Sequence, residues 1–234
     1  MMLYVNGDSH TAAAEAVNPH AFAEDDPALF YLGRAPHPEN LAVSWGQLLS
    51  LTLKSAFRCD AESGSSNSRI MRSTVKWLGD AGRNHPDLLV VIQWSTWERE
   101  EWLYEGEYYQ IGASGTDGVH VGLEERYKQF VATVDWQKKT QQAHDEIWQF
   151  HKELKAQHIR HIFFNGNNDF SHIQKQYNWG ENYIGPYDPK LTYDAVIRSK
   201  GIDTVMPGSW HFGKDGHSAF HRFILDYIIK HKFV

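Results

Sequence analysis

Short apolar runs of β character alternate with helical stretches along the chain, and this alternation limits the fold more than any other feature. Apolar residues at helical spacing predict helices between successive runs. Strands that alternate with helices need crossover connections, which produce a parallel sheet with helices on both faces. The runs lie at 3–5, 57–61, 88–93, 159–164 and 202–205, and the helices at 41–57, 68–78, 123–157 (broken near Asp135) and 214–230.

The pattern predicts one α/β domain over residues 1–234, a length that suits a single core. We expect a three-layer α/β/α sandwich around a flavodoxin-like sheet of five parallel strands in the order 2-1-3-4-5. Two segments read as irregular inserts: 18–40, which holds four prolines, and 98–118, which is rich in Glu, Tyr and Gly. Both leave the sheet near its carboxyl edge, so both should border a site there.

Composition excludes several classes of function. A formal net charge of -6 opposes binding to phosphate backbones, so we expect no nucleic-acid partner. Cys59 is the only cysteine and cannot form an intrachain disulfide. The start of the chain lacks a signal-peptide pattern, and no run is long enough to span a membrane. We therefore expect a soluble, cytoplasmic protein of undefined oligomeric state that does not bind membranes.

Polar turns follow the predicted strands. They lie at 6–10, 64–67 and 165–169, and a fourth polar cluster at 207–217 follows the last strand. Ligands of parallel α/β sheets bind at the carboxyl ends of the strands, so residues far apart in sequence should meet along this edge.

Three of these segments resemble the sequence blocks of the GDSL/SGNH hydrolases. Gly7-Asp8-Ser9, directly after the first strand, resembles the first block, whose serine attacks an ester carbonyl. Residues 61–67 resemble the second block, which would give Gly64 a backbone N–H for the oxyanion. Residues 211–217 resemble the last block, which selects His211 as the catalytic histidine just before the final helix.

The resemblance implies a carboxylic-ester hydrolase without a cofactor. A serine hydroxyl is a poor nucleophile at neutral pH, so Ser9 would need His211 as a base within hydrogen-bond reach. Backbone N–H groups of Ser9 and Gly64 would stabilise the oxyanion. The expected substrate is a small ester, such as an acyl group on a carbohydrate.

The chain departs from the family at two positions. The third block normally supplies an oxyanion Asn, but residues 93–98 contain none, which leaves Thr96 or Asn67 as the third donor. Gly208 stands where the family has an Asp three residues before the histidine. Asp215 or a backbone carbonyl would then orient His211.

Each of these residues also has a structural interpretation. Ser9, Asn67 and Asp215 are residue types that commonly cap helices. His211 could be an ordinary loop histidine.

The tryptophans and the remaining histidines leave further alternatives. Trp94, Trp97 and Trp102 either cover the core, with 98–101 as a solvated face, or form a carbohydrate platform for which Trp94 and Trp97 are the candidates. His217 and His221 have the spacing of two metal ligands but lack a third, so we expect no metal.

A non-catalytic SGNH-like binding or virion-associated module is the competing function. Residues 66–70 and 97–102 resemble a branch of the family found among marine tailed phages.

Overall fold

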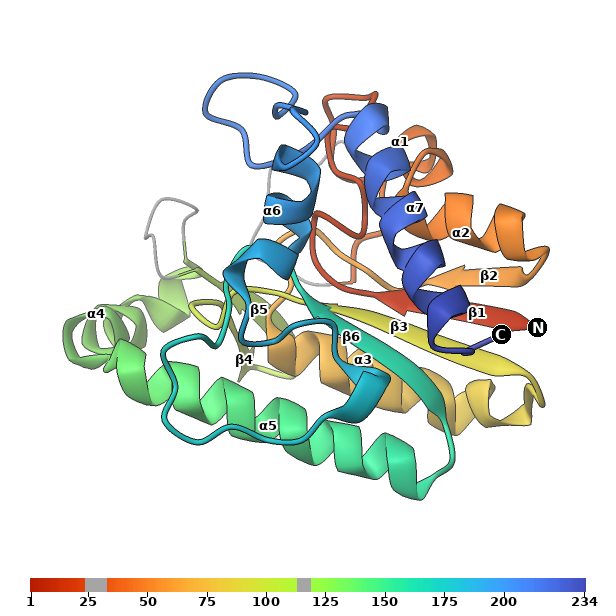
Figure 1. The fold of residues 1–234 in the computed structure, drawn as a ribbon. Helices are drawn as coiled ribbons and strands as arrows, with labels where there is room; N and C mark the ends of the chain where they lie inside the picture. The colour runs from red at the N-terminus through yellow and green to blue at the C-terminus, as the bar shows by residue number, and fades with distance from the viewer. Residues whose placement is uncertain (24–32, 113–118) are drawn as a thin grey trace.

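A four-stranded parallel sheet lies at the centre of the computed structural model, which describes residues 1–23, 33–112 and 119–234 (Figure 1). The strand order is β2-β1-β3-β6, and Val5 pairs with both Cys59 and Val91. The strands are β1 (Met2–Asn6), β2 (Ala56–Cys59), β3 (Leu88–Trp94) and β6 (Arg160–Asn165). The predicted α/β class and the order of the first four parallel strands are confirmed.

The predicted fifth strand, 202–205, is wrong. Thr204 makes only an isolated antiparallel bridge to Phe212, and the N–H of Val205 donates to the carbonyl of His211 at 2.9 Å. Exposed residues lie within this short run and directly after it, so the run has no continuous apolar surface to pack in the sheet. Its backbone groups instead close the loop that carries His211.

Helices cover both faces of the sheet, as Figure 1 shows. One face carries α1 (Pro38–Ala42), α2 (Trp45–Leu53), α6 (Tyr193–Arg198) and α7 (Lys214–Lys230). The other face carries α3 (Asn67–Asp80) and α5 (Trp136–Ala156). Helix α4 (Glu124–Thr133) lies beyond the sheet.

The helix boundaries follow local capping. The predicted helix 214–230 coincides with α7. The predicted break is confirmed at Asp135, whose side chain caps α5 by accepting from the N–H of Lys138 at 3.1 Å. The predicted helix 41–57 is two helices, because Ser44 caps a new one. Among the described helices, none has the length and apolar character that a membrane span requires.

Side chains alternate between two cores along the strands. Leu3 and Val5 pack with residues of α2, α6 and α7, whereas Tyr4 packs with residues of α3 and α5. All seven residues of β3 are buried, as expected for a central strand covered on both faces. Burial on both faces sets the register, because a shift by one residue would exchange the two cores.

The second insert is more regular than the sequence predicted. Its described part forms a hairpin of β4 (Glu100–Tyr104) and β5 (Glu107–Ile111). Glu105 and Gly106 both have positive φ, as a tight two-residue hairpin turn requires. Trp102 and Ile111 are buried in a small cluster with partly buried α4 residues. Residues 24–32 and 113–118 of the inserts lie outside the described part of the chain.

Three buried histidines lie where α5 packs against the sheet: His144 and His151 are in α5, and His161 is in β6. His151 and His161 join through ring nitrogens 2.8 Å apart, and Nε2 of His144 lies 3.0 Å from the hydroxyl of Tyr187. The other ring nitrogen of His144 is buried and makes no hydrogen bond to a described residue, although the carboxylate of Asp145 lies 3.9 Å away. Burial lowers the pKa of all three histidines to about 4, so they fold as neutral rings.

We predict that acid destabilises the protein between about pH 6.5 and pH 4. In this range the unfolded chain binds protons that the folded histidines do not, so stability is lost as pH falls. Urea unfolding at pH 7 and pH 5 should show a loss on the order of 1–2 kcal/mol per histidine. In His151→Phe, the decrease in the free energy of unfolding between pH 7 and pH 5 should be smaller by the contribution of one histidine. His172 is exposed, so the control His172→Ala should show the same decrease as wild type. A free energy of unfolding that is equal at both pH values would contradict this.

Candidate active site

A cavity of about 550 Å³ opens at the carboxyl ends of the strands. Every strand-end loop of the sheet contributes to it, as does the loop before α7. Described residues of both inserts also line it, which confirms that the inserts border this edge. The lining residues are Asp8, Ser9, His10, Phe22, Ser63, Gly64, Thr96, Glu98, Arg99, Gln110, Gly112, Asn167, Asn168, Trp210 and His211.

Ser9 and His211 both line this cavity. Ser9 lies in a turn after β1, and no described helix begins there, so it is not a helix cap. Its side chain is nearly buried, whereas His211 is partly exposed. Among the described residues no hydrogen bond joins the two side chains. The structure therefore brings them to one cavity without linking them directly.

The carboxylate of Asp8 holds the loop that carries Ser9. One oxygen accepts from the N–H of His10 at 3.0 Å and contacts the Nδ1 of that residue at the same distance. The other oxygen accepts from Ser95 Oγ at 2.7 Å and from Arg99 Nη1 at 3.1 Å. Burial alone would raise the pKa of Asp8, but His10 and Arg99 hold it well below its usual range. This charge is therefore fixed in place beneath the cavity.

His10 is already engaged through both ring nitrogens. Nδ1 faces the Asp8 carboxylate, and Nε2 lies 3.1 Å from the carbonyl oxygen of Trp210. Both partners can only accept hydrogen bonds. The Nε2 of His211, in contrast, makes no hydrogen bond to any described residue, and its ring meets that of His10 edge-on at 5.7 Å. His211 is thus the histidine available to act as a base.

A carboxylate faces the other nitrogen of His211. Nδ1 lies 3.0 Å from Oε2 of Glu15, at ion-pair distance, although the N–H direction is not aligned for a good hydrogen bond. Ser209 Oγ donates to the same oxygen at 3.0 Å and accepts from the N–H of His211 at 3.0 Å. Burial and then His10 lower the pKa of His211, and Glu15 opposes that shift.

The expected acid, Asp215, is not at the site. It lies exposed in the first turn of α7 and does not line the cavity. It is not the helix cap either, since Gly213 holds that position without a side-chain bond. Position 208 has a φ of +85°, and a Cβ there would meet nothing within 4 Å. The family's position for the acid therefore points into open space.

Three residues that line the cavity each carry a hydrogen-bond donor for which the described residues offer no acceptor. The backbone N–H groups of Ser9 and Gly64 donate to no described residue. Gly64 has a φ of +82°, which strains any residue with a side chain, and a Cβ there would also have to displace the amide of Gln110, which would lie 1.8 Å away. The hydroxyl of Thr96 accepts from Asn168 Nδ2 at 3.1 Å and from the N–H of Glu98 at 3.3 Å, which leaves its own hydrogen to donate.

The structure does not bring Asn67 to the cavity. Its side-chain oxygen accepts from the N–H of Ser95 at 2.8 Å, and its Nδ2 donates to the carbonyl of Ser95 at 3.2 Å. Asn67 is the first residue of α3, and Ser66 is the cap, accepting from the N–H of Arg69. Asn67 therefore fixes the chain just before Thr96 instead of contacting a substrate.

Trp94 is too deeply buried to form part of a carbohydrate platform, and Trp97 does not line the cavity. Trp94 is only 1% exposed, and Trp97 stacks on Phe170 with ring centroids 4.7 Å apart. Trp102 is also buried, and Trp97 is partly buried against the cluster that holds Trp94, so all three rings pack against apolar neighbours. The exposed tryptophan of the cavity is Trp210, whose exposed fraction is 67%.

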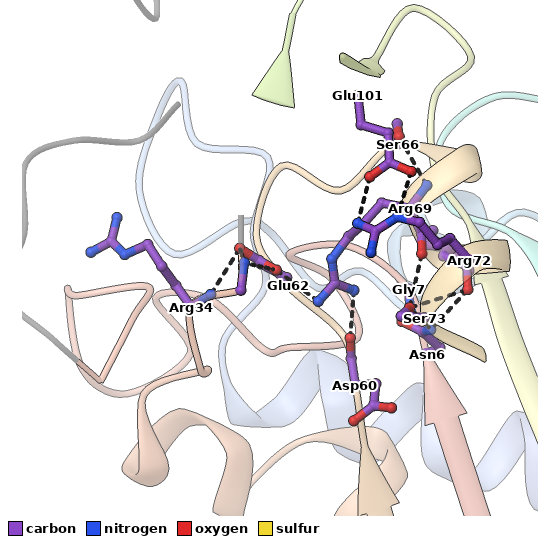
Figure 2. A network of polar contacts seen from close by, with 12 residues as sticks. Asn6, Gly7, Arg34, Asp60, Glu62, Ser66, Arg69, Arg72, Ser73 and Glu101 are labelled. Carbon is purple, nitrogen blue, oxygen red and sulfur yellow. Dashed lines mark hydrogen bonds and ion pairs between the residues drawn. The ribbon is translucent and has the colours of Figure 1, made fainter. Parts of the chain in front are cut away.

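A buried ion pair anchors the loop that carries Gly64 (Figure 2). The carboxylate of Glu62 lies 2.7 Å from Arg69 and accepts from the N–H groups of Gly33 at 2.9 Å and Arg34 at 3.1 Å. Arg69 also donates to the carbonyl of Asp60 at 2.6 Å. Glu62 thus ties the first insert to the second-block loop.

No group of residues in the described part of the chain could hold a metal ion. His217 is buried, and its Nδ1 accepts from the N–H of Trp45 at 3.4 Å. His221 contacts the hydroxyl of Thr52. Both histidines therefore make structural contacts.

Sequence reasoning missed several residues that line the cavity or contact His211. Asn168 and Trp210 lie within polar segments that it marked, so their position was a usable signal. Arg99 entered only as part of a solvated face, in one of the two interpretations of this segment, but it pairs with Asp8. Glu15 carried no signal, because the contact spans most of the chain.

Solved structures of esterases are similar to this chain in fold. An acetyl xylan esterase from Butyrivibrio proteoclasticus is 15% identical with a TM-score of 0.49, over 100% of this chain and 65% of that one, so this chain spans less than two thirds of it. A putative lipolytic protein of the G-D-S-L family from Desulfitobacterium hafniense is 12% identical with a TM-score of 0.49, over 97% and 98% of the chains. An esterase from Pseudoalteromonas sp. is 12% identical with a TM-score of 0.48, over 98% and 97%.

Identities this low do not establish a shared activity, and these matches do not support a phage origin. The search of curated proteins found no match. A family model described as "Family of unknown function (DUF6071)" matches residues 21–151, more than half of the sequence. That segment includes Gly64, Thr96 and Arg99 but neither Ser9 nor His211. The chain belongs to the DUF6071 family.

Proposed function

We propose that this protein is a serine ester hydrolase in which Ser9 is the nucleophile and His211 is the general base. One observation carries the proposal. One cavity is lined by a serine, by a histidine whose Nε2 makes no hydrogen bond to a described residue, and by three residues with a hydrogen-bond donor that lacks an acceptor among the described residues. This is the set of groups that acyl transfer requires.

The residues define the steps of the reaction. Ser9 Oγ attacks the ester carbonyl as its proton passes to Nε2 of His211. The N–H groups of Ser9 and Gly64 and the hydroxyl of Thr96 stabilise the oxyanion. The tetrahedral intermediate collapses to an acyl-Ser9 ester, and the alcohol leaves with the proton from His211. Water, activated by the same histidine, releases the acid and restores Ser9.

The cavity lining favours a small acyl group on a polar alcohol such as a carbohydrate. Phe22 and Trp210 are the only large apolar side chains among its described lining residues, so a long acyl chain would find little apolar surface. Amide and charged groups dominate the rest. The exposed ring of Trp210 offers a flat apolar face against which a sugar ring can pack.

The competing function is a non-catalytic binding module. The observation in its favour is that no hydrogen bond joins Ser9 to His211. Catalytic hydrogen bonds often tighten only when substrate binds, so a kinetic test separates the two functions.

Hydrolysis of p-nitrophenyl acetate should depend on Ser9. We expect Ser9→Ala to lower kcat on the order of 10³-fold or more, because no other group replaces the nucleophile. Ser68→Ala, an exposed serine on α3, is the matched control and should retain full turnover. If the wild-type protein shows no Ser9-dependent turnover of any activated ester, the binding module is the better account.

The hydroxyl of Thr96 should contribute to turnover. Thr96→Val removes this donor and should lower kcat by about 10²-fold, the scale of a lost oxyanion donor. Thr96→Ser keeps the hydroxyl and should retain most of the activity. Thermal melting checks that both variants fold. Equal kcat values for wild type and a folded Thr96→Val would remove Thr96 from the oxyanion site.

Trp210 should recognise the alcohol part of the substrate. Trp210→Ala should raise KM for an acetylated sugar about threefold to tenfold, the scale of one aromatic contact. KM for ethyl acetate should change little, with both reactions followed by pH-stat titration. Trp136→Ala, a partly exposed ring on α5, serves as control. An unchanged KM for the sugar ester would exclude this role.

A further inference from the structure

We propose that Glu15 is the positioning acid of this site, holding His211 in the orientation and protonation state that the reaction needs. The inference rests on the proposed function for its kinetic consequence, but the contact itself can be tested without turnover. Glu15 thus supplies from the loop after β1 a carboxylate that Gly208 lacks.

The geometry connects Glu15 to His211 by two routes. The carboxylate lies 3.0 Å from Nδ1 of His211. It also accepts from Ser209, whose hydroxyl in turn accepts from the backbone N–H of His211. A carboxylate at Nδ1 favours the tautomer that carries hydrogen there, which leaves Nε2 unprotonated and able to take a proton from Ser9. The Glu15 side chain is partly exposed, so it has room to rotate into alignment with Nδ1.

The backbone at Glu15 has an unusual conformation that the rest of the loop holds. Its φ is +64°, in the left-handed region that residues other than glycine rarely adopt. The preceding turn is fixed by hydrogen bonds from Ala14 N–H to the carbonyl of Ser9 at 2.9 Å and from Ala16 N–H to that of Ala13 at 3.1 Å. Ser9 and Glu15 therefore belong to one segment held by backbone hydrogen bonds, so this segment positions the proposed nucleophile and the proposed acid together.

The second element is the loop that carries His211. Its ends are closed by the bridge between Thr204 and Phe212 and by the bond from Val205 N–H to the His211 carbonyl. The side chain of Glu15 reaches this loop, whereas position 208 points into open space.

The charged and titratable groups around His211 determine in which direction its pKa should move when the charge of Glu15 is removed. Glu15 and Asp8 favour its protonated ring, while His10 opposes it, as burial also does. The nearby His217 is affected by His211 in turn. Removing the Glu15 charge should therefore lower the pKa of His211 further.

The test compares Glu15→Gln with Glu15→Asp, which keeps the charge on a shorter side chain. NMR titration of the His211 ring should show a lower pKa in Glu15→Gln than in wild type, and a smaller change in Glu15→Asp. In the active protein, Glu15→Gln should lower kcat on the order of 10²- to 10⁴-fold. It should also move the acid limb of the kcat/KM profile to lower pH, while Glu15→Asp keeps more activity.

Two further variants separate the alternatives. Glu153→Gln, an exposed carboxylate on α5, is the matched control and should change neither the His211 pKa nor kcat. Asp215→Asn tests the acid expected from the sequence, and a loss there with none in Glu15→Gln would overturn the inference. An unchanged His211 pKa in a folded Glu15→Gln would overturn it as well. If wild type has no Ser9-dependent turnover, the proposed function fails, and the NMR titration alone decides whether Glu15 holds His211.

Discussion

The buried carboxylate of Asp8 is the interaction on which the rest of the site depends. It joins the loop after β1, through His10, to the loop after β3, through Ser95 and Arg99. His10 extends the connection to the carbonyl of Trp210, directly before His211. An ionised carboxylate without these partners would be costly at this depth, so its hydrogen bonds restrict all three loops to one arrangement. The loops that carry Ser9, Thr96 and His211 are held by the same buried charge.

The sheet brings these loops together, and this part of the structure could be predicted from the sequence. Periodicity placed α7 at its observed bounds and the helix break at Asp135, because amphipathic spacing and a capping residue are local signals. The polar turns at strand ends located the edge where the cavity opens. The run at 202–205 was wrongly predicted to be a strand of the sheet. A short apolar segment can pair either with the sheet or with a nearby loop, and only tertiary contacts decide which pairing forms.

The partners within the site were beyond sequence reasoning, because they depend on long-range geometry. Asp215 follows His211 closely in sequence, yet the start of α7 leaves it exposed. Glu15 is far from His211 in sequence, and a left-handed backbone conformation accompanies its approach to it. Asn67 was expected to cap a helix or to donate to the oxyanion. In the structure Ser66 caps the helix, and both polar groups of the Asn67 amide bond to the backbone of Ser95.

The central claim is that Ser9, His211 and the three donors act on one reacting carbon. A crystal structure of the protein treated with a serine-directed phosphonate tests it most directly, because the tetrahedral phosphorus mimics the intermediate. We predict phosphorus bonded to Ser9 Oγ, with its oxygen in hydrogen-bond reach of the N–H groups of Ser9 and Gly64 and the hydroxyl of Thr96, and with His211 Nε2 facing Ser9. Phosphorus on another residue, or an unmodified Ser9 in folded protein under conditions that label a known serine esterase, would contradict the account.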